Sequence, residues 1–429
     1  MKYKFTKSNK FLKRSLKSIP MASQTFSKSI YQYPYSSTPF FFERGKGSKV
    51  WDLDGNCFID FSSALLSISL GYRDFDVDQA VKKQMLKGVT FSMPHKIETE
   101  LAELICKIIP SAESVRFAKN GSDATSGAIR LARAYTSKEH IVVCGYHGWQ
   151  DWYIASTTRD LGIPVSDKKL VHKFKYNNIE SLDNIFTKYK NKIAAVIIEP
   201  MSFEYPNNNF LNKIKKIAHK NNSVLIFDET ITGFRWALGG AQEYFKVTPD
   251  LSTFGKGVAD GYPLSILVGK KKIMKLMNDI FFSSTFGGET LSLVAAKTVI
   301  NKMIQEPVIE TINKRGKRLK IEFDKMLDKY KLSKILSLKG HYPWLLLNIN
   351  NTKKYDQWMI KTYLLQELIS NGIFFGGSHN INYSHTDKDI NFLLKKYDEI
   401  LPVLSSLLDN ESLKKKLKSK PLKPLFKVR

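Results

Sequence analysis

Cysteine is scarce in this chain: its 429 residues include only Cys57, Cys106 and Cys144. Three scattered cysteines give neither a disulfide framework nor the paired spacing of a zinc site. Disulfides are also uncommon in reducing compartments. The sequence therefore predicts a protein without a bound metal, located in the cytoplasm.

Long apolar runs are missing as well. No stretch approaches the ~20 consecutive apolar residues that a membrane-spanning helix needs. The hydrophobic content of 43% and the aromatic content of 12% are those of a globular enzyme. The length is sufficient for a large core and two domains. We expect no membrane span.

Acidic residues are almost absent from the two ends. Residues 1–20 hold seven basic residues and no acid, and residues 411–429 hold eight basic residues and one acid. These ends carry more than half of the net charge of +27. No nucleic-acid recognition motif accompanies the charge, and no apolar core of a secretory signal is present. We interpret residues 1–20 as a basic flexible extension and 411–429 as a loose basic tail, with Met1 and Met21 both open as the start.

Strands alternate with helices through the middle of the chain. Residues 141–144, 194–198 and 224–227 are apolar, largely β-branched runs that are typical of buried strands. This alternation predicts an α/β fold with a mainly parallel sheet. We expect a large domain over 76–315 and a smaller α+β domain formed by both chain ends, residues 21–75 and 316–410.

Polar side chains follow these runs directly. Tyr146 and His147 follow the first, Glu199 the second and Asp228 the third. Ligands of an open parallel sheet bind at the carboxyl ends of its strands. An aromatic side chain there can stack on a flat ring, which we expect of Tyr146. We interpret His147 as an internally hydrogen-bonded histidine.

Lys256 lies between Gly255 and Gly257 in a stretch with few other charges. Most lysines are solvated, but two flanking glycines favour a close backbone approach. The stretch is not a P-loop, because no glycine stands five residues before Gly255 and no Ser or Thr follows Lys256. A lysine in a partly dry pocket can act as an amine nucleophile. Together with an acid that pairs with a protonated ring nitrogen, it matches the protein groups that pyridoxal phosphate chemistry needs.

Two loops are candidates for binding a phosphate. Gly121 and Ser122 follow the strand at 114–118 and begin a helix, whose free N–H groups can bind a phosphate. A simply capped helix explains this stretch equally well. The Ser/Thr/Gly loop at 283–289 suits a phosphate or a tight turn.

Taken together, the motifs over residues 24–408 resemble those of the class III (fold-type I) pyridoxal-phosphate aminotransferases. Within that group the chain is most similar to glutamate-1-semialdehyde 2,1-aminomutase. The matching stretches are 120–124 with 128–133, 146–148, 199–200, 227–229 with 232–235, 249–251 with 255–256, and 384–386.

The resemblance implies a catalytic role for four residues. Lys256 would form the Schiff base with pyridoxal 5'-phosphate and then move the proton. Asp228 would keep the pyridine nitrogen protonated, so that the ring can act as an electron sink. Tyr146 would stack on the ring, and Glu199 would lie near its substrate side.

The resemblance also implies a homodimer with a shared active site. Gly121, Ser122 and the partner subunit's Thr285 would hold the phosphate. The cofactor-binding candidates are Gly121, Ser122, Tyr146, His147, Asp228, Lys256 and Thr285.

Three features of the aminomutase are missing here. Residues 31–37 lack its arginine for the substrate carboxylate, residues 64–66 lack its tryptophan, and residues 376–382 lack its gating glutamate. These losses favour an aminotransferase that moves an amino group from an amino acid such as glutamate to a carbonyl acceptor. Aromatic, hydroxyl and amide groups near the expected entrance suit a keto- or aldehydo-sugar for surface polysaccharide. The alternatives are an intramolecular aminomutase, a non-catalytic binding protein on the same fold, and a basic nucleic-acid binder.

Overall fold

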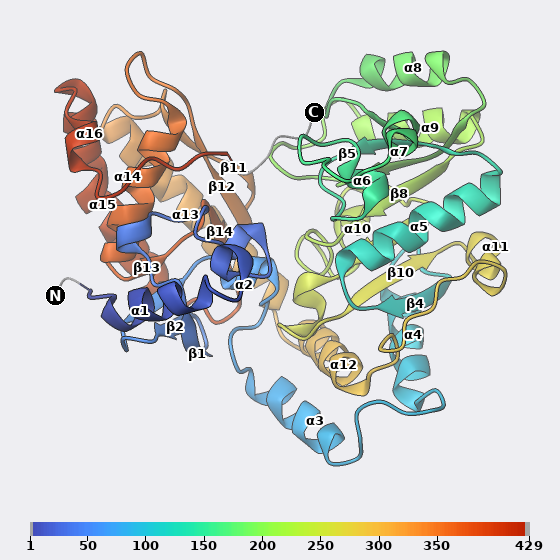
Figure 1. Ribbon diagram of the computed structural model, residues 1–429. Helices are drawn as coiled ribbons and strands as arrows, with labels where there is room; N and C mark the ends of the chain where they lie inside the picture. The colour runs from blue at the N-terminus through green and yellow to red at the C-terminus, as the bar shows by residue number, and fades with distance from the viewer. Residues whose placement is uncertain (1–2, 425–429) are drawn as a thin grey trace. The chain divides into compact units, whose positions relative to one another are not determined.

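A computed structural model describes residues 3–424, which divide into two compact units (Figure 1). The first unit holds the chain up to Asp74 and from Glu310 to the end of the described residues. The second unit is Phe75–Ile309. Within the described residues, no helix is both long enough and apolar enough to cross a membrane.

The second unit is built on a seven-stranded sheet with the strand order β4-β10-β9-β8-β7-β5-β6. Only β10 runs antiparallel to its neighbours, which confirms the predicted α/β fold with a mainly parallel sheet. Its strands are β4 (Ser114–Ala118), β5 (His140–Cys144), β6 (Val171–Lys173), β7 (Ile193–Ile198), β8 (Val224–Asp228), β9 (Leu251–Phe254) and β10 (Ser265–Gly269).

Successive side chains of these strands are buried on opposite faces of the sheet. Ile141 and Val143 of β5 pack in one cluster with α5, whereas Val142 packs in another with α8 and α9. Because both faces are covered there, β5 and β7 consist almost entirely of apolar residues rather than alternating in polarity. The helices of this unit are α3 (Phe75–Met85), α4 (Lys96–Ile108), α5 (Gly121–Thr136), α6 (Asp151–Ile154), α7 (Val165–Leu170), α8 (Ile179–Lys188), α9 (Phe210–Lys220), α10 (Ala241–Tyr244), η4 (Lys256–Ala259), α11 (Lys271–Met274), η5 (Lys275–Asn278) and α12 (Thr290–Gln305).

The first unit contains two small sheets, ordered β1-β2-β3-β13 and β11-β12-β14. Long helices from the C-terminal part of the chain complete its core, in which Phe323, Leu365 and Tyr397 are buried. Its strands are β1 (Phe42–Lys46), β2 (Lys49–Asp52), β3 (Cys57–Asp60), β11 (Leu336–His341), β12 (Trp344–Ile349), β13 (Ile373–Phe374) and β14 (Ser378–Asn380). Its helices are α1 (Thr6–Ser15), η1 (Pro20–Ala22), η2 (Phe26–Lys28), η3 (Tyr35–Ser37), α2 (Ser63–Leu66), α13 (Val308–Lys329, which begins at the end of the second unit), α14 (Gln357–Ser370), α15 (Asp387–Asp409) and α16 (Leu413–Lys416).

The start of the chain differs from the flexible extension expected over residues 1–20. Thr6–Ser15 forms helix α1, in which Leu12 is fully buried. The carboxylate of Asp54, in the turn between β2 and β3, accepts the backbone N–H groups of Lys7 and Ser8 at 2.8 and 2.9 Å. A helix N-terminus is stabilised by such a cap. The cap comes from a residue 46 positions away, so the local sequence did not reveal it.

The basic C-terminal tail, expected to be loose, also packs on the first unit as far as it is described. Leu413 of α16 is fully buried. The side chains of Gln366 and Thr362 on α14 accept the backbone N–H groups of Lys418 and Leu422 at 2.8 and 2.9 Å. The tail therefore follows α14, and residues 425–429 lie outside the described residues.

Candidate active site

The sequence-predicted site residues lie in the second unit, at or just beyond strand ends. Parallel strands with a common direction bring their carboxyl ends to one edge of the sheet, where a ligand can reach several loops at once. Their positions are Gly121 and Ser122 after β4, Tyr146 and His147 after β5, Glu199 after β7, Asp228 at the end of β8 and Lys256 after β9.

Asp228 is buried and its carboxylate is fully engaged. Its Oδ1 accepts the backbone N–H and the hydroxyl of Thr230 at 3.1 and 2.6 Å, and the hydroxyl of Thr253 at 3.2 Å. Its Oδ2 lies 2.9 Å from His147 Nδ1. Burial alone would raise the pKa of Asp228, but the bonds from His147 and Thr230 outweigh it and hold the pKa below its usual value. Asp228 is therefore a fixed negative charge.

His147 links this carboxylate to the neighbouring loop. Its ring is buried, Nδ1 is bonded to Asp228, and its backbone carbonyl accepts the hydroxyl of Thr125 at 2.8 Å. The other ring nitrogen, Nε2, is buried and has no hydrogen-bond partner among residues 3–424. Buried polar atoms are nearly always satisfied, so an orphaned nitrogen is typical of a place that receives a ligand. The internally bonded histidine of the sequence interpretation thus lies inside the site.

Lys256 is held in an uncommon backbone conformation. Its φ of 49° lies in the left-handed region, which costs a non-glycine residue about 1 kcal/mol or more. Burial lowers the pKa of the Lys256 amine, and the cation of Arg235 lowers it further. The negative charges of Glu199 and Asp228 raise the pKa, but they do not outweigh burial. Strain and a lowered amine pKa are both typical of functional lysines.

Glu199 is packed against the loop that follows β5. Its Oε2 accepts the backbone N–H of Tyr146 at 3.0 Å. Gly145, at φ 113°, makes this approach possible, because a Cβ there would lie 2.5 Å from the same oxygen. Burial raises the pKa of Glu199, and the charge of Asp228 adds to this effect. The site therefore holds two carboxyl groups whose pKa values are shifted in opposite directions, an arrangement common in acid–base sites.

The N-terminus of α5 offers free donors beside these groups. Among the described residues, the backbone N–H groups of Gly121 and Ser122 donate no hydrogen bond, as expected in the first turn of a helix. Gly148, at φ 111°, lies so close that a Cβ there would come within 2.6 Å of the Cβ of Ser122. Free amides at the start of a 16-residue helix form a suitable cradle for a phosphate.

Tyr146 and Thr285 differ in their surroundings. The Tyr146 ring is 49% exposed and meets Tyr153 edge-on, with 5.5 Å between ring centroids. Thr285 is exposed in the loop between η5 and α12, and within the described residues no hydrogen bond joins it to the other candidates. Of the sequence-predicted site residues, the structure therefore brings all except Thr285 together around Asp228 and the start of α5.

Sequence reasoning missed three residues of this site. Thr230 and Thr253 both bond to Asp228, and Arg235 acts on the charge of Lys256. Thr230 stands two positions after Asp228, a spacing at which a carboxylate often bonds to its own backbone. Thr253 faces Asp228 through the pairing of β9 with β8, and no local pattern reveals that register.

Comparisons with known proteins agree with this geometry. A family model described as aminotransferase class-III matches residues 30–387. The chain is 34% identical over 388 residues to a 3-aminobutyryl-CoA aminotransferase of Cloacimonas acidaminovorans, covering 88% of this chain and 92% of the relative. It is 34% identical over 383 residues to a glutamate-1-semialdehyde 2,1-aminomutase of Acetivibrio thermocellus, covering 83% and 89%.

Solved structures give the same result at the level of the fold. The FumI protein of Sphingopyxis sp. MTA144, determined in its PLP internal aldimine form, superposes with a TM-score of 0.88 at 27% identity, covering 97% of this chain and 99% of that one. A glutamate-1-semialdehyde aminomutase of Pseudomonas aeruginosa PAO1 in complex with PMP gives a TM-score of 0.82 at 16% identity, covering 92% and 94%.

Proposed function

Because this chain belongs to the class III aminotransferases, a family of enzymes that use pyridoxal 5'-phosphate, we propose that it moves an amino group from an amino-acid donor to a carbonyl acceptor. We further propose that the acceptor is a keto- or aldehydo-sugar for surface polysaccharide. The observation that carries amino transfer is the grouping of a strained lysine of lowered pKa, Lys256, with the buried Asp228 and Glu199.

The residues present fit the cofactor. The carboxylate of Asp228 suits a protonated ring nitrogen, and the free amides of Gly121 and Ser122 suit a phosphate. The orphaned Nε2 of His147 is consistent with a ligand in the space between them. When bound, the cofactor supplies an aldehyde that takes up the amino group and a ring that withdraws electrons.

The roles that we propose for the side chains follow from their charges. Burial lowers the pKa of Lys256, which makes its amine a better proton acceptor and donor for the reaction than a solvated lysine. Asp228, whose pKa the bonds from His147 and Thr230 hold below its usual value, would keep a positive charge on the nitrogen of the cofactor ring. We propose that Tyr146 stacks on the cofactor ring and that Glu199, whose pKa is raised by burial, acts near its substrate side, as the resemblance to the family implies.

The sugar proposal rests on the aromatic, hydroxyl and amide groups that the sequence places near the expected entrance. The first unit, described by itself, contains a cavity with a similar lining. Its volume is about 330 Å³, and its lining contains no arginine that could clamp a carboxylate. The one acid, Asp60, already accepts the hydroxyl of Tyr72 at 2.6 Å and the backbone N–H of Ser62 at 2.7 Å. The lining consists of Lys28, Tyr33, Thr38, Pro39, Phe40, Phe41, Phe42, Asp60, Ser62, Ala64, Leu65, Tyr72 and Phe374. Aromatic faces, a few hydroxyl groups and one cation, Lys28, make this lining suitable for a polar ring.

A second candidate function is the intramolecular aminomutase. It is supported by the relative of that name, which is 34% identical to this chain. The absence of an arginine from residues 31–37 opposes it, because the substrate carboxylate then lacks its expected partner.

The experiment that separates these functions is the visible spectrum of the purified enzyme during titration with single amino donors. We expect a yellow band that one amino acid, such as glutamate, bleaches with release of its 2-oxo acid. A band that ignores amino acids but shifts with glutamate semialdehyde would instead establish the mutase. Absence of any band after addition of pyridoxal phosphate would contradict both and favour a binding protein.

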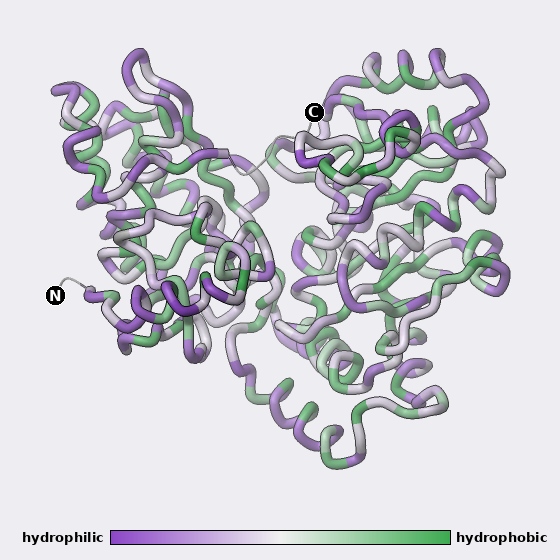
Figure 2. The backbone as a smooth tube through the Cα atoms, viewed as in Figure 1, coloured by the Kyte–Doolittle hydropathy of each residue, from purple (hydrophilic) through white to green (hydrophobic). Residues whose placement is uncertain are grey.

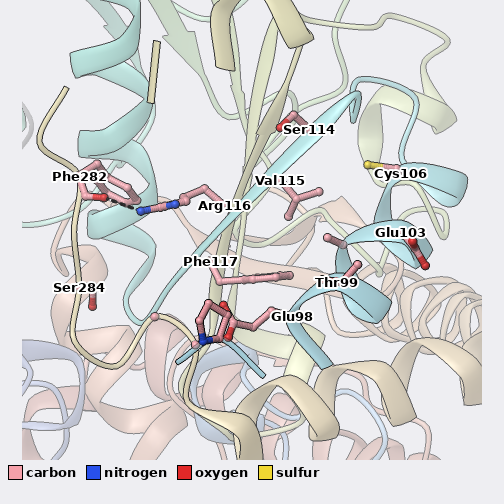
Figure 3. A pocket seen from close by; sticks show the side chains of 14 residues that line it. Glu98, Thr99, Glu103, Cys106, Ser114, Val115, Arg116, Phe117, Phe282 and Ser284 are labelled. Carbon is pink, nitrogen blue, oxygen red and sulfur yellow. Dashed lines mark hydrogen bonds between the residues drawn. The ribbon is translucent and has the colours of Figure 1, made fainter. Parts of the chain in front are cut away.

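We also propose a homodimer in which the partner subunit's Thr285 completes the phosphate site. A cavity of about 670 Å³ opens beside the loop that carries Thr285, and Figure 3 shows Glu98, Phe117 and Ser284 around it. Large apolar side chains are exposed nearby in sequence, with Phe281 at 82% and Met93 at 77%. Exposed apolar groups around a hollow are typical of a surface that another chain covers.

A cytoplasmic location is part of the same proposal. Cys57, Cys106 and Cys144 are all free thiols. Free thiols persist in reducing compartments, which supports this location.

Gly148→Ala tests the phosphate cradle. The added methyl group would come within 2.6 Å of the Cβ of Ser122 and displace the first turn of α5. We expect the dissociation constant for pyridoxal phosphate to rise about tenfold, a loss of about 1.4 kcal/mol, in a titration of the cofactor-free protein.

Gly162→Ala is the matched control. Gly162 has a similarly positive φ of 85°, but its added methyl group would meet no atom within 4 Å. Both variants therefore carry the same kind of backbone cost, and only Gly148→Ala disturbs Ser122. Equal cofactor affinity in the two variants would contradict the predicted cradle.

A further inference from the structure

The exposed face of α1 carries charge of one sign. Lys7, Lys10 and Arg14 recur at the i, i+3, i+7 spacing of one helical face, and Phe11 lies between them. Figure 2 draws α1 largely in purple, the colour of hydrophilic residues. The opposite, buried face consists of Ser8, Leu12 and Ser15. The basic face is therefore held outward by the packing of the helix on its unit.

Carboxylates do not offset this charge. Residues 3–51 contain ten basic residues and one acid, Glu43. All ten basic side chains are exposed, and none forms an ion pair with a carboxylate in the described part of the chain. The carboxylate of Asp54 contacts the start of α1, where it accepts the backbone N–H groups of Lys7 and Ser8. The ten are Lys4, Lys7, Lys10, Lys13, Arg14, Lys17, Lys28, Arg44, Lys46 and Lys49.

Phe11 adds an apolar group to the same face. Its side chain is 42% exposed, although a ring this size is ordinarily buried. The ring leans edge-on against Phe41, with 4.9 Å between centroids, and the Arg14 guanidinium lies 5.6 Å from its centre. A helix that presents an aromatic ring among lysines is typical of helices that lie in the headgroup region of a membrane.

We propose that α1 binds the enzyme reversibly to an anionic lipid surface. The lysines and Arg14 lie against lipid phosphates while Phe11 enters the boundary with the acyl chains. Proteins that bind single strands without sequence preference use a basic groove lined with aromatic side chains on which the bases stack. Proteins that recognise a duplex insert a helix or strand into a groove of the nucleic acid. α1 instead packs its buried face on its own unit, fixed by Asp54, and presents its basic side chains to solvent. This inference does not rest on the proposed reaction.

Sedimentation with sucrose-loaded vesicles tests the proposal on the full-length enzyme. Vesicles of phosphatidylcholine alone are compared with vesicles containing about one-third phosphatidylglycerol, at about 0.1 M salt. We expect sedimentation only with the anionic vesicles, and release at about 0.5 M salt because the charges are screened. Failure to sediment with anionic vesicles would overturn the proposal.

The variant K7E/K10E/R14E locates the binding face. Each cationic side chain near an anionic surface strengthens binding about fivefold, so we expect the lipid concentration at half-binding to rise about 100-fold or more. The matched control is K213E/K216E/K220E on α9, whose three exposed lysines have the same i, i+3, i+7 spacing. Both variants change the net charge by the same amount. Equal loss in the two would overturn the assignment to α1 and indicate a general charge effect.

Two further measurements separate the kinds of partner. Phe11→Ala keeps every charge, and we expect it to weaken vesicle binding about threefold to tenfold through loss of apolar burial. No effect of Phe11→Ala would overturn insertion of the ring. A single-stranded oligonucleotide that binds as tightly as the vesicles and displaces them would overturn the lipid surface in favour of nucleic acid.

Discussion

Lys256→Ala is expected to lower kcat by at least about 10⁴-fold while the protein stays folded. The variant removes the amine of Lys256, which is the one lysine among the described residues with a left-handed backbone and a pKa that Glu199 and Asp228 influence. An alanine can neither bond covalently to the cofactor nor carry the proton, and proton transfer alone is worth up to about 10⁴-fold. Removal of the side chain also relieves no backbone strain, because alanine at φ 49° carries the same cost.

The measurement is single-turnover kinetics combined with borohydride reduction. The wild-type enzyme should retain the cofactor on a lysine after reduction, and Lys256→Ala should retain none. Lys270→Ala is the matched control, since Lys270 lies in the same unit and its amine is bonded to Asp250 at 2.6 Å. Wild-type turnover in Lys256→Ala, or loss of the lysine adduct in Lys270→Ala, would contradict the assignment.

Asp228→Asn is expected to lower kcat about 10²- to 10³-fold, a loss of about 3–4 kcal/mol of transition-state stabilisation. The amide has the shape of the carboxylate but no negative charge. It can keep one bond to Thr230, yet it no longer holds a positive charge on the ring nitrogen that it faces. We expect cofactor binding to weaken much less than turnover falls, because the amides of Gly121 and Ser122 are untouched. The measurement is kcat against cofactor affinity in the same preparation.

Asp250→Asn provides the control for Asp228→Asn. Asp250 is also mostly buried, its pKa is also lowered, and it also pairs with a histidine, His219, at 2.9 Å. Its carboxylate serves structure, since it also accepts the backbone N–H of Leu225. Asp250→Asn should therefore lower stability and leave kcat near wild type. A similar fall in kcat for both variants would show that Asp228 acts only through stability.

Sequence and structure agree where a feature depends on neighbouring residues, as a buried strand does. The strands at 141–144, 194–198 and 224–227 were found from their apolar runs, since burial on both faces of a parallel sheet leaves no polar position in the strand. The same runs predict the positions of Asp228, Glu199 and Tyr146, because Asp228 is the last residue of its strand and the other two stand just beyond a strand end. Lys256 was found from its two flanking glycines.

At the two chain ends, local charge did not predict the structure. Residues 1–20 and the tail after Ser412 were interpreted as loose from their charge, yet the structure packs α1 and α16 on the first unit. In each case the anchor is distant in sequence: Asp54 caps α1, and Gln366 accepts the amide of Lys418. Charge predicts which side chains are solvated, but it does not report which backbone groups find a distant acceptor.

By itself the sequence determined the α/β fold and the cofactor chemistry, and it predicted the lysine and the acid, because periodicity and strand-end position depend on neighbouring residues. Only the tertiary structure decided how that acid is held. Thr253 reaches Asp228 through the pairing of β9 with β8, and His147 reaches it from the loop after β5, 81 positions away. Strand register and loop packing arise from the whole core, so the directions in which the pKa values of Asp228, Glu199 and Lys256 are shifted could not be obtained from the sequence.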